Sequence, residues 1–145
     1  MNCAWEAYIN ILPYCLRQTV DKLGKETLQE LRLRMHRPVE VVTQTGSYFI
    51  EQRKGEKELA YCINAVSGYS PWSAESITQG YITAEGGHRM GICGEITYQE
   101  GKIRTIKNVT SVCIRVARDI PGIASSLTDL EGSILIIGSP GRGKT

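Results

Sequence analysis

Alternation of apolar and polar residues is the main pattern of the chain, and it predicts several β-strands. Residues 31–35 alternate strictly, which is typical of a strand with one apolar face. Extended patterns follow over residues 39–42 and 48–50. The turn residues 45–47 lie between them and predict a hairpin.

The second half of the chain shows the same period over longer stretches. Residues 81–83 lead through a glycine turn into a long predicted strand over residues 88–98. Glu100-Gly101 predicts a tight turn, with a return strand over residues 102–107. A separate strand is predicted over residues 110–117.

Helical spacing appears in shorter stretches between the strands. Apolar residues recur at helical intervals over residues 12–23, and Gly24 is a suitable end signal. A second apolar stripe covers residues 59–66. Short helices are also predicted over residues 70–80 and 123–130.

This order of elements predicts an α+β fold. We expect residues 1–118 to form a small N-terminal domain, with N-terminal helices and a mostly antiparallel sheet. Residues 119–132 are expected to form a linker that contains the helix over residues 123–130, and residues 133–145 to begin a second domain. No internal repeat is visible.

The end of the sequence carries the most specific motif. Residues 133–137 form an apolar run typical of a buried parallel strand. A complete Walker A phosphate loop follows, with the residues Gly138, Ser139, Pro140, Gly141, Arg142, Gly143, Lys144 and Thr145. In such a loop the backbone N–H groups surround phosphates. Lys144 is then expected to reach the β- and γ-phosphates of ATP, and Thr145 to bind Mg²⁺.

The phosphate loop occupies the last eight residues of the sequence, 138–145. The helix that completes such a loop would begin at Lys144, one residue before the end. A strand without a sheet has little to hold it, so a loose Gly/Pro-rich tail is an open alternative for this segment. We expect no bound nucleotide and no ATPase activity from this chain, because a catalytic base and further metal ligands are needed.

Strand alternation also predicts a basic surface. If the strands pair with their apolar sides together, four arginines gather on the other side, namely Arg32, Arg34, Arg89 and Arg115. One interpretation is a solvated sheet face on which some of them pair with Glu30 or Glu95. Alternatively they face phosphates bound by a neighbouring subunit, since the guanidinium fork suits phosphate. A nucleic-acid surface ranks lowest, because few aromatic residues are interleaved.

Composition and charge narrow the classes of protein only slightly. The formal net charge of +2 is too small to indicate nucleic-acid binding. The five cysteines show no metal-binding spacing, so buried free thiols in a reducing compartment are expected. No signal segment or apolar run of membrane-spanning length is visible. His88 is interpreted as an ordinary hydrogen-bonding residue without a catalytic role.

Several of these segments together resemble the stage III sporulation protein AA family. The resemblance covers essentially the whole chain and rests on four stretches, which are residues 31–38, 80–83, 86–95 and 114–118. The most specific is residues 86–95, Gly-Gly-His-Arg-Met-Gly-Ile-Cys-Gly-Glu. The Walker A motif is shared by many ATPases and is less specific.

The resemblance implies a motor related to type II and type IV secretion and pilus ATPases. Such motors have an N-terminal α/β domain, a linker and a RecA-like core, and they assemble as hexamers that use ATP and Mg²⁺. The implied location is the cytoplasmic, mother-cell side of the membrane that faces the forespore. The implied partners are stage III sporulation membrane proteins such as AB, without direct membrane insertion or nucleic acid. Arg89 and Arg115 would lie on strands that carry nucleotide-facing arginines in related motors.

Three functions therefore compete for this sequence. The first is the N-terminal part of an energy-coupling ATPase, in which the domain serves regulation, oligomer contacts and partner docking. The second is a non-catalytic adaptor domain that docks a membrane complex. The third is an accessory domain of a nucleic-acid-linked ATPase.

Overall fold

A computed structural model describes residues 2–68 and 79–139 of the chain. The helices are α1 (Trp5–Ile11), α2 (Tyr14–Leu23) and α3 (Glu56–Val66). The strands are β1 (Leu28–Arg34), β2 (Pro38–Thr43), β3 (Gly46–Arg53), β4 (Tyr81–Thr83), β5 (Arg89–Gln99) and β6 (Lys102–Arg115). Two short 3-10 turns, η1 (Glu85–Gly87) and η2 (Ser125–Leu127), complete the described elements.

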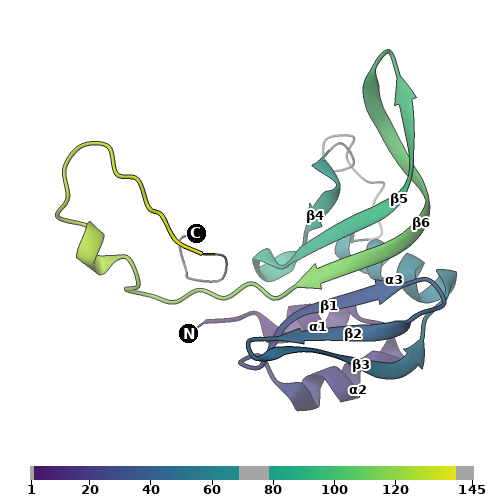
Figure 1. Cartoon of the computed structure of the whole chain (residues 1–145). Helices are drawn as coiled ribbons and strands as arrows, with labels where there is room; N and C mark the ends of the chain where they lie inside the picture. The colour runs from purple at the N-terminus through teal and green to yellow at the C-terminus, as the bar shows by residue number, and fades with distance from the viewer. Residues whose placement is uncertain (1, 69–78, 140–145) are drawn as a thin grey trace.

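The six strands form one sheet in the order β3-β2-β1-β6-β5-β4 (Figure 1). Every neighbouring pair is antiparallel. β1 and β6, far apart in the sequence, lie side by side at the centre and join the two ends of the domain. This arrangement confirms the predicted α+β class with a mostly antiparallel sheet.

The core lies between the helices and one face of this sheet. Leu31 and Leu33 of β1 are fully buried and pair with Ile114 and Val112 of β6. The helices add further buried residues to the same cluster, among them Tyr8, Leu16, Val20, Leu59 and Cys62. Burial of apolar surface is the main stabilising term for such a layer. The last core residue in the described chain is Val116.

The predicted helix over residues 12–23 is confirmed as α2. Pro13 precedes its first residue, where the missing N–H of proline costs nothing. Gly24 ends it with a φ of 77°, which an L-residue with a side chain rarely adopts. The stripe at residues 59–66 lies in α3, whose start is fixed by a Glu58 carboxylate that accepts from the Gly55 N–H. The helix predicted over residues 70–80 lies largely outside the described residues.

One strand prediction is wrong, because the two strands predicted over residues 102–107 and 110–117 are one strand, β6, which ends at Arg115. The break between them is a bulge, where Cys93 pairs with Ser111 but Glu95 pairs with Lys107. Asn108 takes a φ of 46° inside this bulge. β5 is long enough to pair with both halves, so the chain stays in one ladder.

The bulge separates a projecting arm, residues 94–108, from the body of the sheet. β4 pairs only with residues 89–91 of β5, and β1 pairs only with residues 111–115 of β6. The arm therefore has two strands and extends beyond the rest of the sheet (Figure 1).

His88 joins three separate segments at the other end of β5. Its ring is fully buried and stands edge-on to Tyr8, with the centroids 5.1 Å apart. The Ala117 N–H donates to Nδ1 at 2.9 Å, so the neutral ring donates its own proton from Nε2 to the Ala4 carbonyl, also at 2.9 Å. The hydrogen-bonding role expected for His88 is confirmed.

The segment after Val116 differs from the sequence prediction. The helix predicted over residues 123–130 is reduced to the single 3-10 turn η2. Residues 133–137, predicted as a strand, form none, and Leu135 and Ile137 are more than four-fifths exposed. A strand requires a neighbour for its N–H and C=O groups, and no described strand lies beside this segment. No helix in the described ranges, 2–68 and 79–139, is long and apolar enough to cross a membrane.

Candidate functional site

The four predicted arginines lie on the sheet face opposite the core. Arg32 of β1 stands across from Cys113 of β6, and Arg115 of β6 stands across from Arg89 of β5. Arg34 lies two residues beyond Arg32 on β1, so it points to the same side. The predicted common face is confirmed, and we call it the arginine face.

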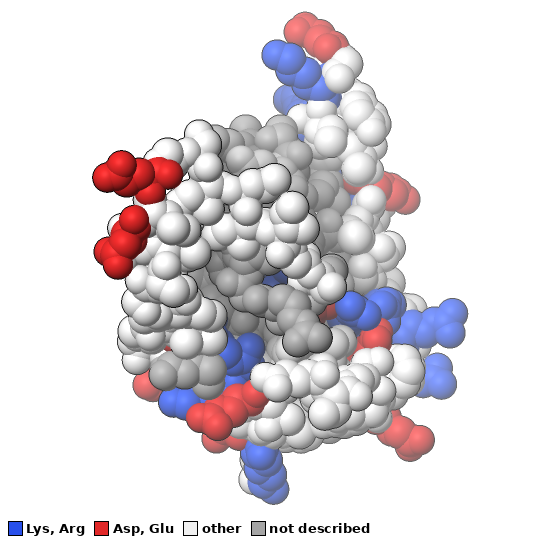
Figure 2. Space-filling view, turned by 60° about the vertical axis from the view of Figure 1, so that its left-hand side comes forward, with Lys and Arg blue, Asp and Glu red and all other residues white. Residues whose placement is uncertain are grey.

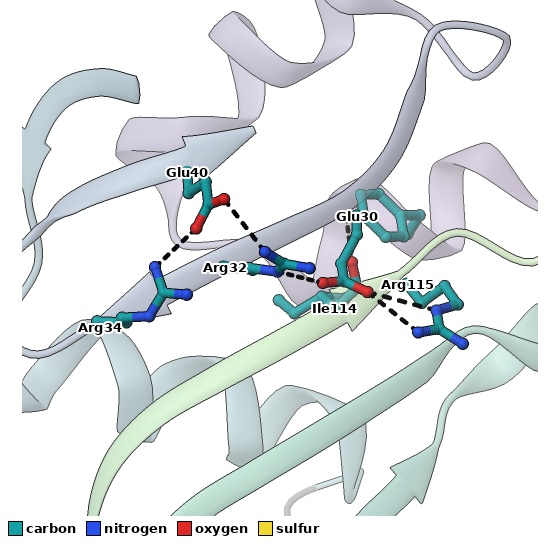
Figure 3. Close-up of polar contacts among 7 residues, drawn as sticks. Glu30, Arg32, Arg34, Glu40, Ile114 and Arg115 are labelled. Atoms are coloured by element: carbon teal, nitrogen blue, oxygen red, sulfur yellow. Dashed lines mark hydrogen bonds and ion pairs between the residues drawn. The ribbon is translucent and has the colours of Figure 1, made fainter. Parts of the chain in front are cut away.

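Two glutamates lie among these arginines and form a row of alternating charge across three strands (Figure 3). Glu40 accepts from Arg34 Nη1 at 2.7 Å through Oε2, and from Arg32 Nη1 at 3.1 Å through Oε1. Glu30 accepts from Arg32 Nε at 2.5 Å through Oε1. Its Oε2 accepts from Arg115 Nη2 and Nε at 3.3 and 3.4 Å.

The carboxylates are the inner members of this row and the guanidinium groups are the outer ones. The Glu30 and Glu40 side chains are each 11% exposed, whereas the Arg115 side chain is 69% exposed. The hydrogen bond from Arg34 is the largest cause of a lowered pKa at Glu40. The hydrogen bond to Glu30 likewise raises the pKa of Arg32. Both groups are therefore charged at neutral pH.

Arg89 differs from the other three arginines in having no carboxylate partner in the described part of the chain. Its guanidinium lies over the Tyr81 ring, 4.4 Å from the centroid. Its directly opposed neighbour on β6 is Arg115, another cation. Like charges at such positions repel, so this end of the row carries uncompensated positive charge.

Of the two carboxylates expected to pair with the arginines, only Glu30 does so. Glu95 instead accepts from the side-chain amide of Asn108 at 2.8 Å. Glu40 was missed by the sequence reasoning, although a signal existed. Val39 and Val41 are buried on β2, so alternation places Glu40 on the outer face, and the hairpin places it beside Arg32.

The phosphate loop lies mostly outside the described residues, which include only Gly138 and Ser139 of the motif. Both are exposed and belong to no helix or strand. These two residues by themselves form no cradle for a phosphate. Pro140, Gly141, Arg142, Gly143, Lys144 and Thr145 lie outside the described residues, so their assignment to ATP and Mg²⁺ stays a prediction.

The charged side chains on one face of the molecule are mixed in sign (Figure 2). Figure 2 shows both basic and acidic groups on the face drawn, and groups of both signs lie together at the top of the view. This pattern agrees with the formal net charge of +2. The positive charge at Arg89 and Arg115 is therefore a local feature.

The cysteines only partly follow the expectation of buried thiols. Cys62 is buried, and burial raises its pKa to about 12. Cys15 and Cys93 are exposed, which corrects the expectation, and alternation with buried Ile92 places Cys93 on the sheet face opposite the core. Within residues 2–68 and 79–139, no three His, Cys, Asp or Glu side chains are grouped as metal ligands.

Comparison with known proteins gives two distant matches. The chain is similar to stage III sporulation protein AA of Bacillus subtilis (strain 168), with 28% identity over 144 residues. The match covers 93% of this chain and 47% of that relative, so the chain spans about half the relative's length. The X-ray structure of the Legionella pneumophila ATPase DotB matches with a TM-score of 0.47 and 14% identity, over 79% of this chain and 31% of that one. At these values the structural similarity carries no argument about function.

A family profile matches nearly the whole chain. The profile described as sporulation stage III, protein AA, covers residues 5–145. The match includes the whole sheet, the arginine face and the terminal phosphate-loop sequence. The chain therefore belongs to the family of sporulation stage III, protein AA.

Proposed function

We propose that this chain is the N-terminal part of an energy-coupling ATPase that acts in endospore formation. In this proposal the α+β domain serves oligomer contacts, regulation and partner docking. The ATPase core binds ATP and Mg²⁺ through the phosphate loop and assembles as a hexamer. Membership of the sporulation family and the terminal Walker A sequence support this assignment.

The observation that carries a role for the domain is that Arg89, which has no described carboxylate partner, lies directly opposite Arg115, whose bonds to Glu30 are long. The two guanidinium groups belong to directly opposed residues, and one of them has no carboxylate partner in the described chain. Paired guanidinium forks are well suited to phosphate oxygens. We propose that this pair faces a nucleotide phosphate held by a neighbouring subunit, and that Arg32 and Arg34 serve mainly to hold Glu30 and Glu40.

The adaptor function has its own support in the arm. Ile96 and Tyr98 are 47% and 66% exposed and alternate onto one face, so this surface suits a protein contact. In this second proposal the domain docks stage III sporulation membrane proteins such as AB, on the mother-cell side of the membrane that faces the forespore. Its arginines then have no contact with nucleotide.

Substitution in the full-length protein separates the two proposals. Arg89→Ala and Arg115→Ala should each lower ATPase activity by about 100-fold while the oligomer still forms, because a phosphate-facing donor acts in the transition state. Arg34→Ala is the matched control, since Arg34 lies on the same face but is held by Glu40 at 2.7 Å. Activity should be measured together with oligomer size. Unchanged activity in the Arg89 and Arg115 variants would favour the adaptor.

A further inference from the structure

The row of charges on the arginine face is incomplete at one end. Its members come from β1, β2 and β6 and run Arg34, Glu40, Arg32, Glu30 and Arg115, so that cations and anions alternate. Arg89 on β5 continues the row directly after Arg115, and no described carboxylate stands between them. By alternation, the missing member is an anion between Arg115 and Arg89.

Glu30 binds its two arginine partners at different distances. Its bond to Arg32 Nε is short, at 2.5 Å. Its bonds to Arg115 are long, at 3.3 and 3.4 Å, and converge on one oxygen atom. If Arg115 leaves, Glu30 keeps a strong cationic partner in Arg32 and is not left as an uncompensated buried charge.

The exposure of the partners shows which group can move. The Glu30 side chain on β1 is nearly buried, at 11% exposed, and is held by Arg32 at 2.5 Å. The Arg115 side chain is 69% exposed, so its guanidinium can turn toward Arg89 without passing through packed atoms. An anion bound there would offer Arg115 shorter charge-assisted hydrogen bonds than Glu30 does.

We propose that Glu30 is a built-in competitor for the anion site of the Arg89–Arg115 pair. In the free domain Glu30 holds Arg115 on the β1 side. A phosphate group that binds to Arg89 draws Arg115 away from Glu30, and Arg32 keeps Glu30 neutralised. Glu30 thus lowers the affinity of the Arg89–Arg115 pair for phosphate. This regulation rests on the phosphate-facing role proposed above for Arg89 and Arg115.

Pyrophosphate binding to the 145-residue chain tests this inference. Inorganic pyrophosphate is titrated at constant ionic strength, and the Nε–Hε signals of arginine side chains are followed by NMR. Glu30→Gln should bind pyrophosphate about two- to fivefold more tightly than the unchanged chain, which is the range for a weak, partly exposed ion pair. Glu40→Gln is the matched control, because it removes the same charge from an equally buried position on the same face. Its affinity should stay within about twofold of the unchanged chain.

The unchanged chain provides a second measurement that does not depend on a variant. On pyrophosphate binding, the Arg115 and Arg89 signals should shift together, while the Arg32 signal should keep its position. This result would support the competition even if Glu30→Gln did not fold.

The outcomes separate failure of this inference from failure of the proposed function. Pyrophosphate that binds at Arg89 and Arg115 with equal affinity in the Glu30→Gln and unchanged chains overturns the competition but leaves the phosphate-facing role intact. Equal tightening by Glu30→Gln and Glu40→Gln also overturns it, because the effect would then be one of general charge. Saturable binding only in Glu30→Gln supports the competition. No saturable binding in any of the chains overturns the competition, whereas the phosphate-facing role is decided by the ATPase activity of Arg89→Ala and Arg115→Ala in the full-length protein.

Discussion

Glu40 shows how a single side chain organises the outer face of this domain. It is nearly buried and accepts from two arginines, so its charge is compensated at both oxygens. A carboxylate in this position stabilises the fold only while it is ionised. Its effect on stability therefore depends on pH.

The lowered pKa of Glu40 predicts a specific acid sensitivity. The unfolded chain has an ordinary glutamate pKa of about 4.3. Because the folded pKa is lower, the contribution to stability is complete above that value and is lost as pH falls through the folded pKa. Glu40→Gln should lower the free energy of unfolding at pH 7 by about 1 kcal/mol and flatten its dependence on pH below 5.

Urea unfolding of the Glu40→Gln chain from pH 7 down to pH 3 measures this effect. Glu95→Gln is the control, because Glu95 is exposed and accepts a side-chain hydrogen bond from Asn108 and from no arginine in the described chain. The control should keep the acid profile of the unchanged chain. An unaltered profile in Glu40→Gln would contradict the role of its ion pairs in stability.

At the scale of elements, the β5–β6 ribbon depends on a close approach at its bulge. Gly94 lies where the arm leaves the body of the sheet. A Cβ added at Gly94 would come within 2.6 Å of the Lys107 carbonyl oxygen and 2.8 Å of Ile106 Cγ2. Backbone atoms cannot yield as a flexible side chain can, so only glycine fits there.

The bulge therefore predicts unequal costs for two glycine substitutions on β5. Gly94→Ala should lower the free energy of unfolding by about 1–3 kcal/mol, since the ladder must shift to admit the methyl group. Gly91→Ala, where the nearest atoms lie 3.9 Å away, should change it by less than about 0.5 kcal/mol. Chemical denaturation of both variants decides the matter. Equal free energies of unfolding for the two variants would show that the bulge has room for a methyl group at position 94.

The ribbon also marks the limit of prediction from sequence at this scale. Period-two alternation predicted both strands, because side chains on a half-buried sheet must alternate. It could not show that the two strands predicted over residues 102–107 and 110–117 are continuous in β6. Continuity across Asn108 depends on pairing with β5, which is a long-range contact.

At the scale of the whole molecule, the described contacts that hold the domain together all involve residues before 121. Asn2 and Asp119 exchange two backbone hydrogen bonds, at 2.7 and 2.8 Å, and join the start of the chain to the exit from the sheet. Arg118 donates to the carbonyls of Lys25 and Leu28. Residues 121–139 contribute no residue to the core.

This closure predicts which shortened chains stay stable. A chain that ends at Ile120 should have a free energy of unfolding within about 0.5 kcal/mol of that of the 145-residue chain, because residues 121–139 contribute nothing to the core. A chain that ends at Ala117 should lose about 1–3 kcal/mol, since the bonds of Arg118 and Asp119 are removed. Thermal and urea unfolding of the three chains provide the comparison. A large loss on ending at Ile120 would show that the following segment belongs to the folded unit.

The sequence by itself determined the class of the fold, most of the strands and the common face of the four arginines. These follow from local periodicity, since one apolar face must be buried and the opposite residues must then point outward. The tertiary structure alone decided the charge pairing on that face. Glu40 and Glu30 reach the arginines across β1, β2 and β6, and only the pairing register brings them together. It also decided that Arg89, which has no described carboxylate partner, lies opposite Arg115, because this pairing is a contact between residues 26 positions apart.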